Sequence, residues 1–174
     1  YTTTSNKISI SGTFADEPNW SLLTNTYNNS SSAEERAAVA NLMYHCGVSV
    51  NMDYEVSSKG GSGAVTQSVA NALSNYFNYD PGHDAHVRYF YDSHTWANLI
   101  KEELNQGRPV IYSGNSSSGG HAFVCDGYDE NNKFHFNWGW SGMSDGYFEL
   151  SALNPGSVGI GGGSGSGYNN NQAI

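Results

Sequence analysis

Apolar residues recur with helical spacing over the first two thirds of the chain. The clearest segment is 33–46, where four apolar side chains follow the i, i+3, i+4, i+7 pattern of one helix face: Val39, Leu42, Met43 and Cys46. The S-x-x-E capping box is matched by Ser32, just before this segment, and Glu35, in its first turn. We therefore expect a helix that begins after Ser32 and ends at Gly47, because glycine commonly terminates helices.

Weaker patterns predict five more elements before residue 109, among them a short helix that follows a turn at DEPNWSLL. Apolar faces with helical spacing indicate helices over about 65–77 and 95–105. Alternation of polar and apolar residues indicates an edge strand within 1–12, and the run VSVNMDY indicates a short strand over 48–54. The first part of the chain is therefore expected to be mostly helical.

After Pro109 the spacing of apolar residues changes from that of helices to that of strands. Four runs with strand character follow one another: PVIY, HAFVCDGY, KFHFNW and GYFEL. Short polar turns join the last three, so we expect an antiparallel meander. The end of the chain, 154–174, is rich in glycine and is expected to add nothing to the core, as a mobile loop or a disordered end. The predicted fold class is α+β, with residues 1–174 forming a single domain.

The charge and cysteine content of the chain exclude several classes of partner and site. Seven Lys and Arg against sixteen Asp and Glu give a net charge of −9, which disfavours nucleic acid and anionic membranes as partners. No apolar run is long enough to span a membrane. The two cysteines neither form a disulfide framework nor have the spacing of a zinc site. The chain begins at Tyr1 rather than at methionine, which favours a processed product or a fragment.

The candidate catalytic residues lie in the predicted meander. The stretch GGHAFVCDGY places His121 after two glycines, and HFNWGWSG places Asn137 beside Trp138 and Trp140. A thiol nucleophile needs a base, and the base needs a third group that orients its ring. An asparagine oxygen can accept from one imidazole nitrogen and leave the other facing sulfur, while tryptophans exclude water. Since successive strands of a meander are neighbours, we expect Asn137 to lie beside His121.

These motifs closely resemble the streptopain family, the secreted papain-like cysteine proteases of bacteria. The resemblance begins with the stretch from GGHAFVCDGY to GGGSGSG, and it extends upstream through NQGRPVIYSG, MYHCGVSVNMDYEVSSKGGSG, NWSLL and YTTT. It implies a papain-like fold and a secreted endopeptidase, associated with virulence, that is made as a zymogen, cleaves proteins or peptides and needs no cofactor or metal.

The resemblance also implies the roles of individual residues. His121 matches the catalytic histidine, Asn137 the residue that orients it, and Trp138 with Trp140 the indole pair beside it. The stretch 161–167 resembles a mobile loop that borders the substrate cleft. Four residues match backbone positions that hold the substrate chain: Gly61, Ser62, Gly119 and Gly120.

The nucleophile that the resemblance implies has no counterpart in the sequence. The family carries it upstream of everything matched here, at the start of a helix in a GCVATA-like motif. Cys125 follows His121 by four residues on one strand, so their Cα atoms are about 13 Å apart at about 3.3 Å per residue. Cys46 stands at the C-terminal end of a helix, where the dipole disfavours a thiolate. Both cysteines are expected to be buried and structural.

The predicted function is therefore a cysteine endopeptidase with a divided active site. His121 comes from this chain, and the cysteine comes from an upstream segment or an associated light chain. Two alternatives stay open. One is a catalytically inactive relative that binds peptides, and the other is a surface or adhesion module, suggested by the abundance of Tyr, Asn, Ser and Gly.

Overall fold

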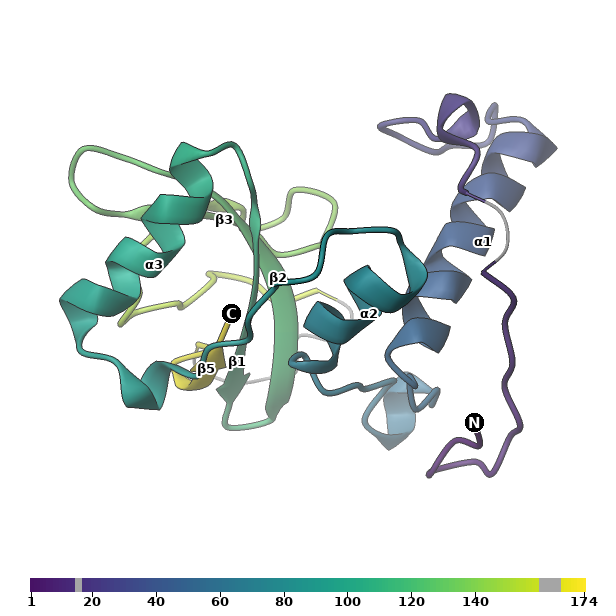
Figure 1. Ribbon diagram of the computed structural model, residues 1–174, viewed down its shortest axis with the longest axis horizontal. Helices are drawn as coiled ribbons and strands as arrows, with labels where there is room; N and C mark the ends of the chain where they lie inside the picture. Colours follow the sequence, from purple (N-terminus) through teal and green to yellow (C-terminus); the bar gives the residue numbers. More distant parts are fainter. Residues whose placement is uncertain (15–16, 160–166) are drawn as a thin grey trace. The chain divides into compact units, whose positions relative to one another are not determined.

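A computed structural model describes residues 1–14, 17–159 and 167–174 of the chain (Figure 1). The chain divides into two compact units. Unit 1 comprises Tyr1–Val56 and Ser62–His83, and unit 2 comprises Ser57–Gly61 and Asp84–Ile174. Each unit is described by itself, and the single domain expected for residues 1–174 stays a prediction.

Unit 1 is helical, as its apolar spacing predicted. Its elements are η1 (Trp20–Leu22), α1 (Ala33–Ser49) and α2 (Ser68–Tyr76). The capping box before α1 is confirmed: Ser32 Oγ accepts from the Glu35 amide at 3.1 Å, and the Ser32 amide donates to Glu35 Oε2 at 2.7 Å. These two bonds satisfy amide groups that the first helical turn leaves without partners.

The predicted end of α1 at Gly47 is wrong, since the helix continues to Ser49. Gly47 is needed there for packing, because a Cβ atom at this position would lie 2.0 Å from the Tyr54 hydroxyl oxygen. The predicted apolar face is also only partly covered. Val39 and Leu42 are half-buried, but Met43 is 68% exposed and Cys46 is exposed.

The strands predicted in unit 1 are wrong. Residues 1–12 contribute only an isolated bridge between Thr2 and Ser9, and the predicted strand over 48–54 contributes only the bridge of Asp53 to Gly63. Alternation over so few residues does not make a strand when no neighbouring strand offers a ladder of hydrogen bonds. The helix α2 is shorter than the predicted 65–77.

Unit 2 contains the predicted meander. Its strands are β1 (Val110–Ser116), β2 (Gly119–Tyr128), β3 (Phe134–Asn137), β4 (Gly146–Phe148) and β5 (Asn170–Ala173). They form one sheet in the order β4-β3-β2-β1-β5, and each neighbouring pair is antiparallel. The four consecutive strands confirm the meander, and together with the helices they confirm the α+β class.

The fifth strand overturns the expectation for the end of the chain. β5 pairs with β1, and the C-terminus lies beside it (Figure 1). Tyr168 is 1% exposed and Gln172 4% exposed. The Gln172 amide accepts from the Tyr112 hydroxyl at 2.9 Å and donates to the Leu150 carbonyl at 2.9 Å. Tyr168, Gln172 and Ala173 are therefore buried, although Asn169, Asn170 and Asn171 are exposed. The predicted mobile loop at 161–167 falls almost entirely outside the described residues.

The helix α3 (Ser93–Asn105) covers part of the sheet and contacts β1 and β2. Asp92 caps it by accepting from the amides of His94 and Thr95. Its inward face joins the strands in one core cluster, which contains Trp96, Ile100, Val110, Tyr112, Phe123, Cys125, Phe134, Phe136, Trp138, Trp140, Leu153 and Tyr168. Most of these side chains are aromatic, and this core borders the candidate site.

Candidate active site

The candidate base, His121, lies on β2 on the same face of the sheet as the core residue Phe123. Its neighbour across the ladder is Gly114 of β1. A Cβ atom at Gly114 would lie 2.3 Å from the Tyr168 carbonyl oxygen, so only glycine lets the chain before β5 pass this close. The Tyr168 ring then lies 5.5 Å from the imidazole, measured between centroids. The segment before β5 thus lies beside the histidine ring.

A backbone carbonyl determines the protonation of the His121 ring. His121 Nε2 lies 2.8 Å from the Trp138 carbonyl oxygen. Because a carbonyl only accepts hydrogen bonds, Nε2 carries the proton and Nδ1 of the neutral ring keeps its lone pair. No hydrogen bond to Nδ1 is present among the residues that the structure describes. The ring is therefore a base whose available nitrogen is Nδ1.

Burial shifts the acid–base equilibrium of this ring. Desolvation lowers the pKa of His121 below its ordinary value, and the hydrogen bond to the Trp138 carbonyl opposes this shift in part. At neutral pH the imidazole is accordingly in its neutral form and able to take a proton.

Two tryptophans form a wall beside the imidazole. The Trp140 indole stacks on the His121 ring, with centroids 4.9 Å apart and planes 16° from parallel. Trp138 stacks in turn on Trp140 at 5.6 Å and is fully buried. Gly159 crosses the Trp140 indole so closely that a Cβ atom would lie 2.4 Å from the ring. The indoles therefore keep water from one face of the base.

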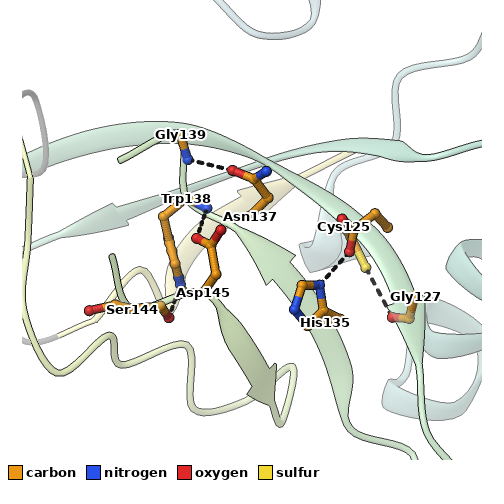
Figure 2. A network of polar contacts seen from close by, with 9 residues as sticks. Cys125, Gly127, His135, Asn137, Trp138, Gly139, Ser144 and Asp145 are labelled. Atoms are coloured by element: carbon orange, nitrogen blue, oxygen red, sulfur yellow. Dashed lines mark hydrogen bonds and ion pairs between the residues drawn. The ribbon is translucent and has the colours of Figure 1, made fainter. Parts of the chain in front are cut away.

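Asn137 does not contact His121 directly, contrary to the predicted hydrogen bond. Its Oδ1 accepts instead from the Gly139 amide at 2.9 Å (Figure 2). The cause is the pleat of the sheet. Asn137 pairs with Val124, and paired residues point to the same face of the sheet. His121 precedes Val124 by an odd number of residues on β2, so its side chain points to the opposite face.

The two residues are nevertheless connected through one peptide group. The Gly139 amide and the Trp138 carbonyl belong to the same peptide unit. Asn137 holds the N–H end of this unit, and His121 bonds to its carbonyl end. Hydrogen bonds in such a chain polarise one another, so Asn137 strengthens the acceptor that orients the base.

A carboxylate and a serine carbonyl also hold Trp138 in place. The Trp138 amide donates to Asp145 Oδ1 at 2.9 Å, and the indole N–H donates to the Ser144 carbonyl at 3.0 Å (Figure 2). Sequence reasoning missed this contact. No local pattern signals it, because the two residues meet only through the loop that joins β3 to β4.

The four predicted substrate-binding residues lie in two places. Gly119 and Gly120 directly precede His121 on β2 and are exposed. Gly61 belongs to unit 2 and Ser62 to unit 1, where Ser62 Oγ bonds to the Glu55 backbone. Contact of any of these residues with a substrate stays a prediction.

Neither cysteine is an activated thiol. Cys125 is fully buried, as predicted, and burial raises its pKa to about 12. The predicted burial of Cys46 is wrong, because the residue is exposed near the end of α1. Partial desolvation still raises the pKa of this thiol. A nucleophilic cysteine needs the opposite shift.

The remaining histidine of the sheet has a different environment. His135 lies on β3 on the face opposite to the core, and its Nδ1 lies 2.5 Å from Asp126 Oδ1. No cluster of metal-ligating side chains occurs in the described part of the chain. Within the same residues, no helix has the length and apolar character needed to cross a membrane.

A half-buried histidine, an asparagine and an indole wall on a β meander are the features that the sequence analysis associated with a cysteine peptidase. The model of the Peptidase C10 family matches residues 1–148. The chain is 43% identical over 155 residues to streptopain of Streptococcus pyogenes, an alignment covering 89% of this chain. It is 42% identical over 168 residues, or 94% of its length, to the thiol protease/hemagglutinin PrtT of Porphyromonas gingivalis. The chain therefore belongs to the Peptidase C10 family.

Solved structures agree with this membership. The structure of the active wild-type interpain A cysteine protease of Prevotella intermedia matches with a TM-score of 0.80 and 34% identity, covering 90% of this chain and 62% of that one. A fragment of prointerpain A from the same organism matches with a TM-score of 0.73 and 31% identity, covering 91% of this chain and 47% of that one. The chain spans 38% of the length of streptopain and 18% of that of PrtT.

Proposed function

We propose that this chain supplies the general base of a secreted bacterial cysteine endopeptidase, in which His121 activates a cysteine carried by a segment outside these 174 residues. The observation that carries the proposal is the state of His121. The Trp138 carbonyl holds Nε2–H, which leaves the Nδ1 lone pair available to a thiol.

The proposed reaction follows from this geometry. Nδ1 takes the proton of the thiol, and the Trp138 carbonyl stabilises the resulting imidazolium through Nε2–H. The thiolate attacks a peptide carbonyl and forms an acyl-enzyme, while the imidazolium returns its proton to the leaving amine. A water molecule, deprotonated at its attack by the same Nδ1, then releases the acyl group as a carboxylic acid. The lowered pKa of His121 favours the return of the proton.

The chemistry of the two cysteines supports a nucleophile outside the chain. Burial makes Cys125 inert, and the thiol of Cys46 has a raised pKa at the wrong end of a helix. The apolar face of α1 is only partly covered, with Met43 68% exposed, and this supports an associated segment that covers the rest. Synthesis as a zymogen agrees with the prointerpain A fragment among the solved relatives.

Selective alkylation of the intact protein tests the proposal. Limiting iodoacetamide at mildly acidic pH reacts quickly only with a thiolate paired to an imidazolium. We expect the label on a cysteine outside the 174 residues, located by mass spectrometry of the digested protein. Fast labelling of Cys46 or Cys125 would contradict the divided site. Peptide binding without any fast-reacting thiol would instead support the inactive relative.

Replacement of the base gives the matching kinetic test. His121→Ala should lower kcat by at least about 1,000-fold and abolish fast alkylation, because the thiol loses the base that takes its proton. His135→Ala is the matched control, since this histidine pairs with Asp126 on the other face of the sheet and should leave turnover intact. Near-ultraviolet circular dichroism verifies that both variants fold. Retained activity of His121→Ala would contradict the assignment of His121 as the general base.

A further inference from the structure

Trp138 is held at three points, and each of its contacts runs to a different group. Its carbonyl accepts from His121 Nε2 at 2.8 Å, its amide donates to Asp145 Oδ1 at 2.9 Å, and its indole N–H donates to the Ser144 carbonyl at 3.0 Å. The residue is fully buried. The direction of the carbonyl that meets the imidazole is therefore determined by the loop from which Ser144 and Asp145 come (Figure 2).

The bond to Asp145 replaces a partner that the sheet does not provide. β3 ends at Asn137, and its pairing with β2 ends at the same residue, opposite Val124. The Trp138 amide thus lies beyond the ladder, where a buried N–H needs another acceptor. A carboxylate is a strong one, because a hydrogen bond to a charged acceptor is roughly twice as strong as a neutral bond.

We propose that Asp145 is a positioning residue for the base: by fixing the Trp138 backbone it aims the Trp138 carbonyl at His121 Nε2 and so keeps the imidazole lone pair on Nδ1. This role rests on the function proposed for His121. Asp145 itself makes no contact with the ring among the described residues, and it acts only through Trp138. Asn137, on the opposite face of the sheet, holds the Gly139 end of the same segment.

The tautomer of His121 is the direct readout of this role. In the intact protein labelled with ¹⁵N-histidine, at a mildly alkaline pH where the ring is neutral, we expect a single Nε2–H tautomer. Asp145→Ala should produce a mixture with Nδ1–H, because the carbonyl is no longer held in line with the ring. Asp145→Asn should restore the single tautomer, since the amide oxygen can still accept from the Trp138 amide.

Kinetics of the complete enzyme give the second readout. Asp145→Ala should lower kcat about 10–100-fold with KM nearly unchanged, because a displaced base affects the proton transfer and not the binding of substrate. Asp145→Asn should recover most of this loss. A KM effect of the same size as the kcat effect would indicate a change in the substrate cleft and would contradict the positioning role.

Two control variants separate positioning from general stability. Asp126→Ala removes the carboxylate that pairs with His135 on the other face of the sheet. Asp92→Ala removes the side-chain cap of α3 and destabilises the same unit. Both should leave the His121 tautomer unchanged. If Asp92→Ala gives the same mixture of tautomers as Asp145→Ala, the mixture results from a general loss of stability and the proposal fails.

The outcomes for the base and for its positioning residue are separable. A single Nε2–H tautomer and an unchanged kcat in Asp145→Ala overturn the positioning role, whatever His121→Ala does. If His121→Ala keeps its activity while Asp145→Ala still gives a mixture of tautomers, the proposed function fails. The role of Asp145 in orienting the His121 ring through Trp138 is then still supported. Should Asp145→Ala not fold, Asp145→Glu replaces it, because the added methylene displaces the acceptor. An unchanged tautomer there overturns the proposal equally.

Discussion

The two units of the chain differ in how much apolar surface they bury. In unit 2, twelve buried side chains form one cluster, most of them aromatic. In the described part of unit 1, Val48 and Ala72 are the only buried apolar side chains. Large apolar residues remain exposed there, with Trp20 at 64%, Met43 at 68% and Val65 at 64%.

This difference separates a unit that is stabilised by its core from one that relies on surface contacts. Unit 1 is tied together by exposed hydrogen bonds, such as those from Ser5 to Asp53 and from Tyr44 to the Ser11 carbonyl. Such bonds add little net stability, because water offers equivalent partners. In unit 2, Trp138 and Trp140 belong to the core and also form the wall beside His121. The aromatic core therefore stabilises unit 2 and shapes the candidate site at the same time.

The largest expected effect comes from removing the central indole. Trp138→Ala should lower the free energy of unfolding of unit 2 by about 3–5 kcal/mol, because the cavity left behind cannot close. Met43→Ala, the control in unit 1, should stay within about 0.5 kcal/mol, since the side chain is 68% exposed. Urea denaturation followed by tryptophan fluorescence and far-ultraviolet circular dichroism measures both. Equal losses would contradict the difference between the units.

Amide hydrogen exchange tests the comparison without any variant. Amides of β1, β2 and β3 should exchange at least roughly 100-fold more slowly than those of α1 and α2, because the core of unit 2 opens only on global unfolding. Mass spectrometry of peptic fragments resolves the two sets. Equal protection of α1 and β2 would show that unit 1 is as stable as unit 2.

A smaller effect is expected at the glycine inside α1. Gly47→Ala should destabilise unit 1 by about 1–3 kcal/mol, because its Cβ atom would meet the Tyr54 hydroxyl and this overlap outweighs the better helix propensity of alanine. Thermal unfolding followed at 222 nm measures the change, since α1 is helical. Gly63→Ala is the control, because no atom lies within 4 Å of a Cβ added there. A stabilised Gly47→Ala would show that Tyr54 moves aside freely.

The smallest effect is a pH dependence of unit 2. Burial lowers the pKa of His121, so the unfolded chain binds a proton at a higher pH than the folded one. The stability that the neutral ring contributes is present above the unfolded pKa of about 6.5 and is lost as the pH falls toward the lower folded pKa. Comparison with His121→Gln isolates this loss, which the variant should lack. Identical pH profiles would contradict the burial of the ring.

Elements that depend on near neighbours in sequence were predictable. The capping box and apolar spacing of α1, the helix α3 and the four consecutive strands all follow from contacts within a few residues or between adjacent hairpin strands. The candidate base could also be located, because a histidine after two glycines and an Asn-Trp-Gly-Trp motif form a specific pattern. The sequence by itself thus determined the class of the fold, the family and the position of His121.

Tertiary structure alone decided which atoms meet. The pleat and register of β2 and β3 put Asn137 and His121 on opposite faces, and the Trp138 carbonyl became the partner of the base. Asp145 reaches Trp138 through a loop whose path no local propensity specifies. The end of the last strand, Gln172 and Ala173, is buried because β5 pairs with the edge strand β1 and the core accepts Tyr168. Periodicity shows which side of an element is apolar, whereas hydrogen-bond partners depend on where distant segments cross, and only the packed chain determines that.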